Sequence, residues 1–117
     1  MNGIDFVADT NILIYFLEGN HKLKSFRQSS FAASVVSEIE LLSWHKIPES
    51  DKKIIKAFLD NCFVIELLPA IKDIAITLRQ KHKIKLPDAV VAATSVYLDI
   101  PLLTSGKSFQ KSQTSRC

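Results

Sequence analysis

Four short apolar segments alternate with longer segments of helical spacing along this chain, and this alternation constrains the fold most. Strand-forming residues dominate segments 4–8, 31–36, 63–67 and 100–104. Helices are predicted to begin at residue 10 or 11, and at residues 37, 50, 69 and 86. Strands that alternate with helices favour a parallel sheet covered on both faces. The sequence therefore predicts an α/β domain of three layers, with a central parallel sheet of about four strands flanked by helices.

Composition is that of a single globular domain and argues against several classes of protein. Hydrophobic residues make up 47% and charged residues 23% of the 117 residues, which is an ordinary balance. No apolar run reaches the roughly 20 residues that span a bilayer, and the N-terminus lacks a signal-peptide pattern. The two cysteines, Cys62 and Cys117, form no motif, so a reduced, cytoplasmic location is expected. The net charge of +3 permits a polyanionic partner without requiring one.

Three acidic residues stand where predicted strands end or predicted helices begin. Asp9 ends the first strand, Glu40 follows the second strand, and Asp88 opens the last long helix after Pro87. In an open parallel sheet, ligands bind at the carboxyl ends of the strands. These three side chains are therefore the candidates for one shared site.

Each acid also has a purely structural explanation, and these explanations remain open. Asp9 can cap the helix that follows it, because Asp is a preferred N-cap residue. Ser37 and Glu40 match the capping box Ser-x-x-Glu. Asp88 in a first helical turn complements the helix dipole. Taken one at a time, none of the three acids requires a catalytic role.

Taken together, the three acids favour a cation site. Two ionised carboxylates about 5 Å apart repel each other by roughly 3 kcal/mol at an effective dielectric constant near 20. A divalent cation with oxygen ligands removes that cost, and Mg²⁺ or Mn²⁺ suits a carboxylate site. The matching chemistry is metal-assisted hydrolysis of a phosphodiester. No rival site is visible, because His21, His45 and His82 lack zinc spacing and the three glycines form no phosphate-binding loop.

Three blocks of the sequence resemble the signature blocks of PIN domains, and most closely those of VapC-like toxin ribonucleases of type II toxin–antitoxin systems. The blocks are residues 7–15, 37–42 and 85–94, and residues 102–104 resemble the start of a fourth block. Each block alone is moderately specific, whereas the ordered set with its spacing is much more so. The likeness predicts a single PIN domain over residues 1–109, followed by a polar tail, 110–117.

The resemblance also implies a function. It implies an Mg²⁺- or Mn²⁺-dependent endoribonuclease in which Asp9, Glu40 and Asp88 are the catalytic, metal-binding acids. Asn11, Ser37 and Thr104 match polar positions that orient the acids or the RNA substrate. The family further implies a homodimer and a cognate VapB-like antitoxin that covers the active site.

The fourth block departs from the family pattern. Gly106 stands where the family usually has an acid or Asn, Ser108 stands where it has another acid, and the usual final strand is replaced by polar sequence. We therefore expect an enzyme weakened by the loss of its fourth acid. The alternative is a catalytically degenerate PIN remnant that dimerises or binds an antitoxin. A flavodoxin-like response domain is disfavoured, because Lys107 lacks the acidic pair and phospho-acceptor such a domain would need. Metal-dependent RNA cleavage separates the first two hypotheses.

Overall fold

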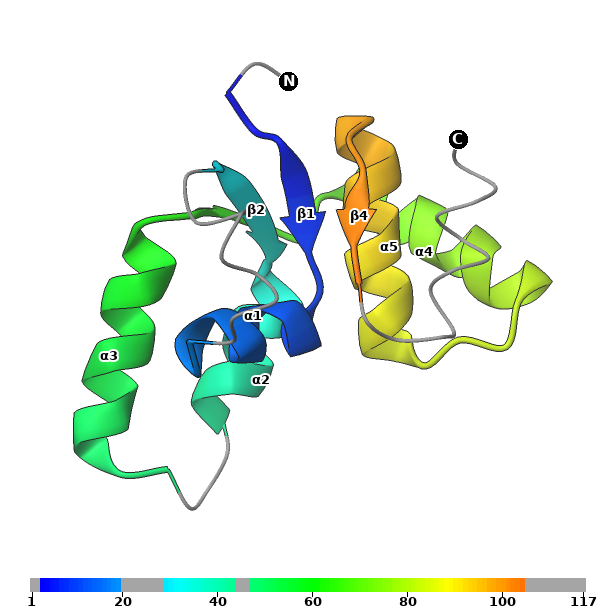
Figure 1. Cartoon of the computed structure of the whole chain (residues 1–117). Coiled ribbons are helices and arrows are strands. Elements are labelled where there is room, and N and C mark those ends of the chain that lie inside the picture. The colour runs from blue at the N-terminus through cyan, green and yellow to red at the C-terminus, as the bar shows by residue number, and fades with distance from the viewer. Residues whose placement is uncertain (1–2, 20–28, 44–46, 105–117) are drawn as a thin grey trace.

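The computed structural model describes residues 3–19, 29–43 and 47–104, and its strands form one parallel sheet (Figure 1). The strands of the described residues pair in the order β3-β2-β1-β4. The predicted α/β fold with about four parallel strands is confirmed. In chain order the elements are β1 (Phe6–Ala8), α1 (Thr10–Leu17), β2 (Phe31–Ser34), α2 (Val35–Ser43), α3 (Glu49–Asp60), β3 (Phe63–Ile65), α4 (Pro69–Lys81), α5 (Leu86–Leu98) and β4 (Leu102–Leu103).

Helices cover both faces of the sheet, because successive strand side chains point to opposite sides. Phe6 and Ala8 of β1 pack with residues of α1, α2 and α3, whereas Val7 packs with residues of α5. On the outer side of α5, α4 contributes Ile71 and Ala75 to a further apolar cluster. Figure 1 shows α1–α3 on one side of the sheet and α5 with α4 on the other. These are the three predicted layers.

The strands are shorter than the sequence suggests. The second strand, predicted over 31–36, ends at Ser34, and α2 begins at Val35 rather than at residue 37. The Ser34 hydroxyl accepts a hydrogen bond from the backbone N–H of Val36 at 3.1 Å, as an N-cap side chain does. Val35 and Val36 are β-branched and look like strand residues, but this cap turns the chain into a helix two residues earlier than predicted.

The carboxyl ends of the strands and the starts of three helices meet at one edge of the sheet. α1 and α2 begin directly after β1 and β2, and α5 runs back against the strands so that its first turn lies at the same edge (Figure 1). None of the described helices has the length and apolarity to cross a membrane. Residues 105–117, which include Gly106, Ser108 and the predicted tail, lie outside the described residues.

Candidate active site

Strand register brings the ends of β1 and β4 together at this edge. Ala8 pairs with Leu103, so the next residues, Asp9 and Thr104, lie side by side although they are far apart in sequence. The Thr104 hydroxyl donates a hydrogen bond to Asp9 Oδ2. Asp9 is only 2% exposed. The pairing of two parallel strands thus creates the first contact of the site.

The other oxygen of Asp9 caps α1. Oδ1 accepts a hydrogen bond of 2.8 Å from the backbone N–H of Ile12. The N-cap explanation for Asp9 is therefore correct, and it coexists with a position at the carboxyl edge. A buried carboxylate held through both oxygens has one orientation, which is the arrangement that a binding site needs.

Glu40 is held by a hydroxyl that the sequence patterns did not single out. Thr10, the first residue of α1, donates to Glu40 Oε1 at 2.9 Å. The same Thr10 oxygen lies 2.9 Å from the hydroxyl of Ser37, which is fully buried. The capping-box interpretation of Ser37 and Glu40 is wrong, because α2 begins at Val35 and both side chains are bonded to Thr10.

Asp88 lies in the first turn of α5 and is within electrostatic reach of the other two acids. Burial raises the pKa of Asp88 most, the negative charges of Glu40 and Asp9 raise it further, and Lys85 lowers it. Like charges that approach each other favour the protonated acid. One acid at this edge therefore has a raised pKa, with burial as its largest cause.

The three carboxylates share a neighbourhood without closing around one ion. Within residues 3–19, 29–43 and 47–104, no three His, Cys, Asp or Glu side chains are arranged to hold a metal. Carboxylate and hydroxyl oxygens are nevertheless the donors that hard divalent cations prefer. The donor chemistry fits such a cation, and one that bound all three acids would require side chains to rotate.

The remaining predicted positions differ in their surroundings. Thr104 is partly buried and bonded to Asp9. Asn11 is exposed, and its side chain makes no hydrogen bond within the part of the chain that the structure describes. Ser37 contacts Thr10 rather than the surface. An orienting role for Asn11 thus stays a prediction, and Thr10 joins the set of polar residues at the edge.

Two other reactive side chains offer no competing site. Burial raises the pKa of the Cys62 thiol to about 11, with Glu38 and Asp60 adding to the rise. A thiol with that pKa stays protonated at neutral pH and is a poor nucleophile. His82 ends α4 and is half-buried, whereas His21 and His45 lie outside the described residues.

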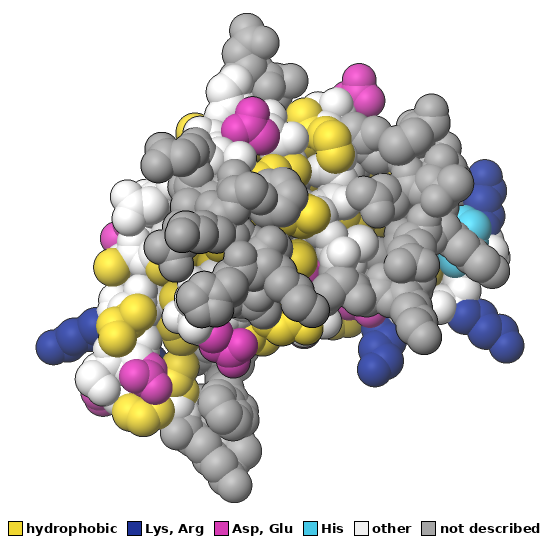
Figure 2. All heavy atoms as spheres, viewed as in Figure 1, with side chains coloured by type: hydrophobic (Ala, Val, Ile, Leu, Met, Phe, Trp, Pro, Cys, Tyr) yellow, Lys and Arg dark blue, Asp and Glu magenta, His cyan; other side chains and the backbone are white. Residues whose placement is uncertain are grey.

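A groove of about 660 Å³ opens from the acidic edge between α1, α2 and α3, and we call it the α1–α3 groove. Its charged residues are all acidic: Glu18, Glu40 and Asp51. Figure 2 shows acidic and hydrophobic side chains together over the α3 side of the molecule, whereas Lys and Arg side chains lie mostly toward α4. The other residues that line the α1–α3 groove are Thr10, Ile14, Leu17, Leu41, Ile47, Ile54 and Ile55.

Comparisons with known proteins agree with the observed fold, and the matched residues include Asp9, Glu40 and Asp88. The PIN domain family profile matches residues 6–113. A toxin–antitoxin complex from Klebsiella pneumoniae contains a chain that is 27% identical, with a TM-score of 0.80 and 91% of each chain covered. VapBC2 from Rickettsia felis, solved with a DNA fragment from its promoter, is 19% identical over 92% of each chain, with a TM-score of 0.76. No curated protein sequence matches the chain significantly.

Proposed function

Because the chain belongs to the PIN domain family, we propose that it is a VapC-like toxin that cleaves RNA with the help of Mg²⁺ or Mn²⁺. One observation supports this most. Asp9 caps α1, Glu40 lies in the second turn of α2 and Asp88 in the first turn of α5, yet the charges of Asp9 and Glu40 both act on Asp88. The likeness of the fold to a chain in a toxin–antitoxin complex supports the toxin assignment.

In this proposal the three acids hold the cation, and the surrounding groups orient them. When bound, a divalent cation supplies Lewis-acid stabilisation for phosphodiester hydrolysis. Asp9 has a fixed orientation, because Ile12 and Thr104 each donate to one of its oxygens. The N-termini of α1 and α5 lie at this edge, and helix N-termini attract the anionic phosphate of RNA.

The direct test is cleavage of RNA by the purified chain with Mg²⁺ or Mn²⁺. Cleavage should disappear with a chelator and in Asp9→Asn, whose side chain keeps oxygen and amide groups for the cap but loses the charge. Because Asn is as good an N-cap as Asp, the free energy of unfolding of the variant should lie within about 1 kcal/mol of that of the parent. Metal-independent cleavage, or full activity in Asp9→Asn, would exclude the proposed mechanism.

The sequence of the fourth block favours weak activity. With Gly106 and Ser108 in place of acids, a second cation or an attacking water lacks an anchor, since two-metal sites place acids on both sides of the phosphate. Complete absence of cleavage by the parent, together with antitoxin binding, would favour the alternative of a non-catalytic PIN remnant.

The α1–α3 groove is the surface that we propose for a VapB-like antitoxin. An apolar groove with only acidic charges fits an amphipathic segment that carries Lys or Arg beside its apolar side chains. The groove includes Glu40 and Thr10, so a segment bound there would cover the acidic edge. A cytoplasmic location would follow from the RNA substrate and the antitoxin.

Ile54 allows this surface to be tested. Its side chain is 60% exposed and lines the groove. Ile54→Glu should weaken binding of the cognate antitoxin, encoded by the neighbouring gene, by at least about tenfold in calorimetry, because it buries a charge among apolar groups. The matched control is Tyr97→Glu on α5, where Tyr97 is 44% exposed and lies outside the groove. Equal losses in both variants would place the antitoxin elsewhere.

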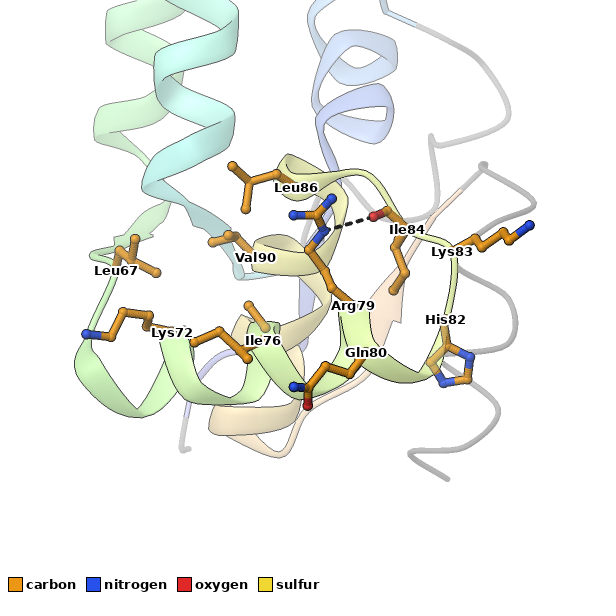
Figure 3. Close-up of a pocket in the computed structure, with 11 residues that line it drawn as sticks. Leu67, Lys72, Ile76, Arg79, Gln80, His82, Lys83, Ile84, Leu86 and Val90 are labelled. Carbon is orange, nitrogen blue, oxygen red and sulfur yellow. Dashed lines mark hydrogen bonds between the residues drawn. The ribbon is translucent and has the colours of Figure 1, made fainter.

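We further propose that a second copy of the chain packs on the α4–α5 face, defined by Leu67, Leu68, Ile76 and Leu86. All four side chains are exposed. Three of them line a pocket of about 510 Å³ between α4 and α5, where Arg79 Nε donates to the carbonyl of Ile84 (Figure 3). Leu86 lies two residues before Asp88, so a two-fold contact here would bring two acidic edges into one groove. Lys72 and Lys83 at this pocket would then meet RNA phosphates.

A further inference from the structure

The hydroxyl of Thr10 stands between two other polar groups and must donate to one of them. It lies 2.9 Å from Ser37 Oγ and 2.9 Å from Glu40 Oε1. An ionised carboxylate only accepts hydrogen bonds, and a hydroxyl has one proton. Thr10 therefore donates to Glu40, and its oxygen accepts the proton of Ser37. The result is a directed chain of hydrogen bonds that runs from Ser37 through Thr10 to Glu40.

This series of hydrogen bonds connects a buried side chain to a solvent-exposed one. Ser37 has no exposed surface, whereas Glu40 is exposed. An exposed Glu loses considerable rotamer freedom when it is fixed in one position. Successive hydrogen bonds polarise one another and strengthen the chain. The buried end can therefore hold the carboxylate of Glu40 in place before any ligand arrives.

The Thr10 hydroxyl is not needed to build its own helix. Asp9 already caps α1 through the backbone N–H of Ile12. Glu40 Oε2 makes no hydrogen bond within the described ranges, so it remains available to a ligand while Oε1 is held. The geometry thus separates the two oxygens of Glu40 into one that is anchored and one that is open.

We propose that Thr10 is a positioning residue that orients Glu40 for a divalent cation, with Ser37 as its buried support. The inference rests on the proposed function, because it assigns Glu40 to cation binding. It adds a residue to the site whose contribution acts through Glu40 rather than through contact with the ion or the RNA.

The test measures Mn²⁺ affinity by calorimetry in the absence of RNA. Thr10→Val keeps the branched shape and removes the hydroxyl, and it should weaken Mn²⁺ binding by about tenfold, the low end for a hydrogen bond to a charged group, since Glu40 is exposed. Thr10→Ser keeps the hydroxyl and should bind like the parent. Ser37→Ala should fall between the two, because Thr10 can still donate to Glu40.

The outcomes distinguish this inference from the proposed function. Absence of Mn²⁺ binding by the parent would defeat both. Parent-like affinity in Thr10→Val, or an equal loss in Thr10→Ser, would overturn the role of the hydroxyl while leaving the nuclease proposal intact. If Thr10→Val does not fold, Ser37→Ala tests the inference instead. Parent-like Mn²⁺ affinity in Ser37→Ala would overturn the proposed role of the Ser37–Thr10–Glu40 hydrogen bonds. A melting temperature measured without metal should change little in Thr10→Ser, which serves as the matched control.

Discussion

At the scale of one residue, the ionisation of Asp88 lowers the stability of the fold. Its carboxyl is partly buried beside two other acids, and burial is the largest cause of its raised pKa. The folded chain therefore binds the proton of Asp88 more tightly than the unfolded chain, in which the pKa of this carboxyl lies near its ordinary value of 3.8. Stability contributed by this group is present below that value and is lost as the pH rises through the raised pKa.

Removing this charge should stabilise the protein at neutral pH. Asp88→Asn should melt a few degrees above the parent near pH 7, and the difference should shrink toward pH 3.5, where most Asp88 carboxyls are protonated in both states. Calorimetric melts at both values test this, with Asp73→Asn on the exposed side of α4 as control. A gain that does not depend on pH would mean that something other than ionisation is responsible.

Sequence patterns pointed to the three acids as candidates but not to the Thr10 hydroxyl, which donates to one of them. Asp9, Glu40 and Asp88 could be proposed because each was expected to follow a strand or to open a helix. Thr10 could not, because its partners Ser37 and Glu40 lie 27 and 30 positions away, and only the packing of α1 against α2 brings them together. The family resemblance pointed instead to Asn11, which is exposed.

At the scale of elements, the types of structure were predictable and their ends were not. Alternating strands and helices gave the correct order of all four strands and of the five helices in the described part of the chain. The fourth strand, expected over 100–104, is only Leu102–Leu103. Apolar runs report burial, whereas a strand ends where its hydrogen-bond ladder ends, and that depends on the neighbouring strand.

The junction between α5 and β4 depends on a buried serine. Ser95 Oγ donates to the carbonyl of Ile100 at 2.6 Å, and the N–H of Ile100 donates to the carbonyl of Ser95 at 3.2 Å. The two bonds fix the turn that returns the chain from α5 to the sheet edge. Ser95 is only 1% exposed, so no water competes for the first bond.

Ser95→Ala should destabilise the protein by about 1–2 kcal/mol, the cost of a buried acceptor that loses its donor. Urea unfolding measures the loss, and Thr77→Ala on α4 is the control, because that hydroxyl bonds its own helix at an exposed position. A loss equal to that of the control would mean that the Ser95 hydroxyl does not secure β4.

At the scale of the whole molecule, two apolar surfaces lie on opposite sides of the sheet. The α1–α3 groove is acidic, and the pocket of the α4–α5 face contains no acidic residue. The two surfaces share no residue, so the proposed binding of a basic segment on one side and of a second copy on the other would not compete.

The proposed self-association should therefore be weakened by a substitution on α4 and not by one on α3. We expect a dimer by sedimentation at micromolar concentration and a monomer for Ile76→Glu, because the variant would bury a charge among the apolar side chains of the contact. Ile54→Glu should remain a dimer. A monomeric parent would contradict the proposed dimer, and a dimeric Ile76→Glu would move the contact to another surface.

The contact between Asp9 and Thr104 has a consequence for the timing of synthesis. It joins residues 95 positions apart, and β4, the last described strand, pairs with β1, the first. While the ribosome still holds residue 104, β1 has no partner on that side and the carboxylate of Asp9 has lost one of its two donors. A nascent chain thus lacks the Asp9–Thr104 contact until β4 has been made, so the proposed site is completed only after every other described strand and helix has been synthesised.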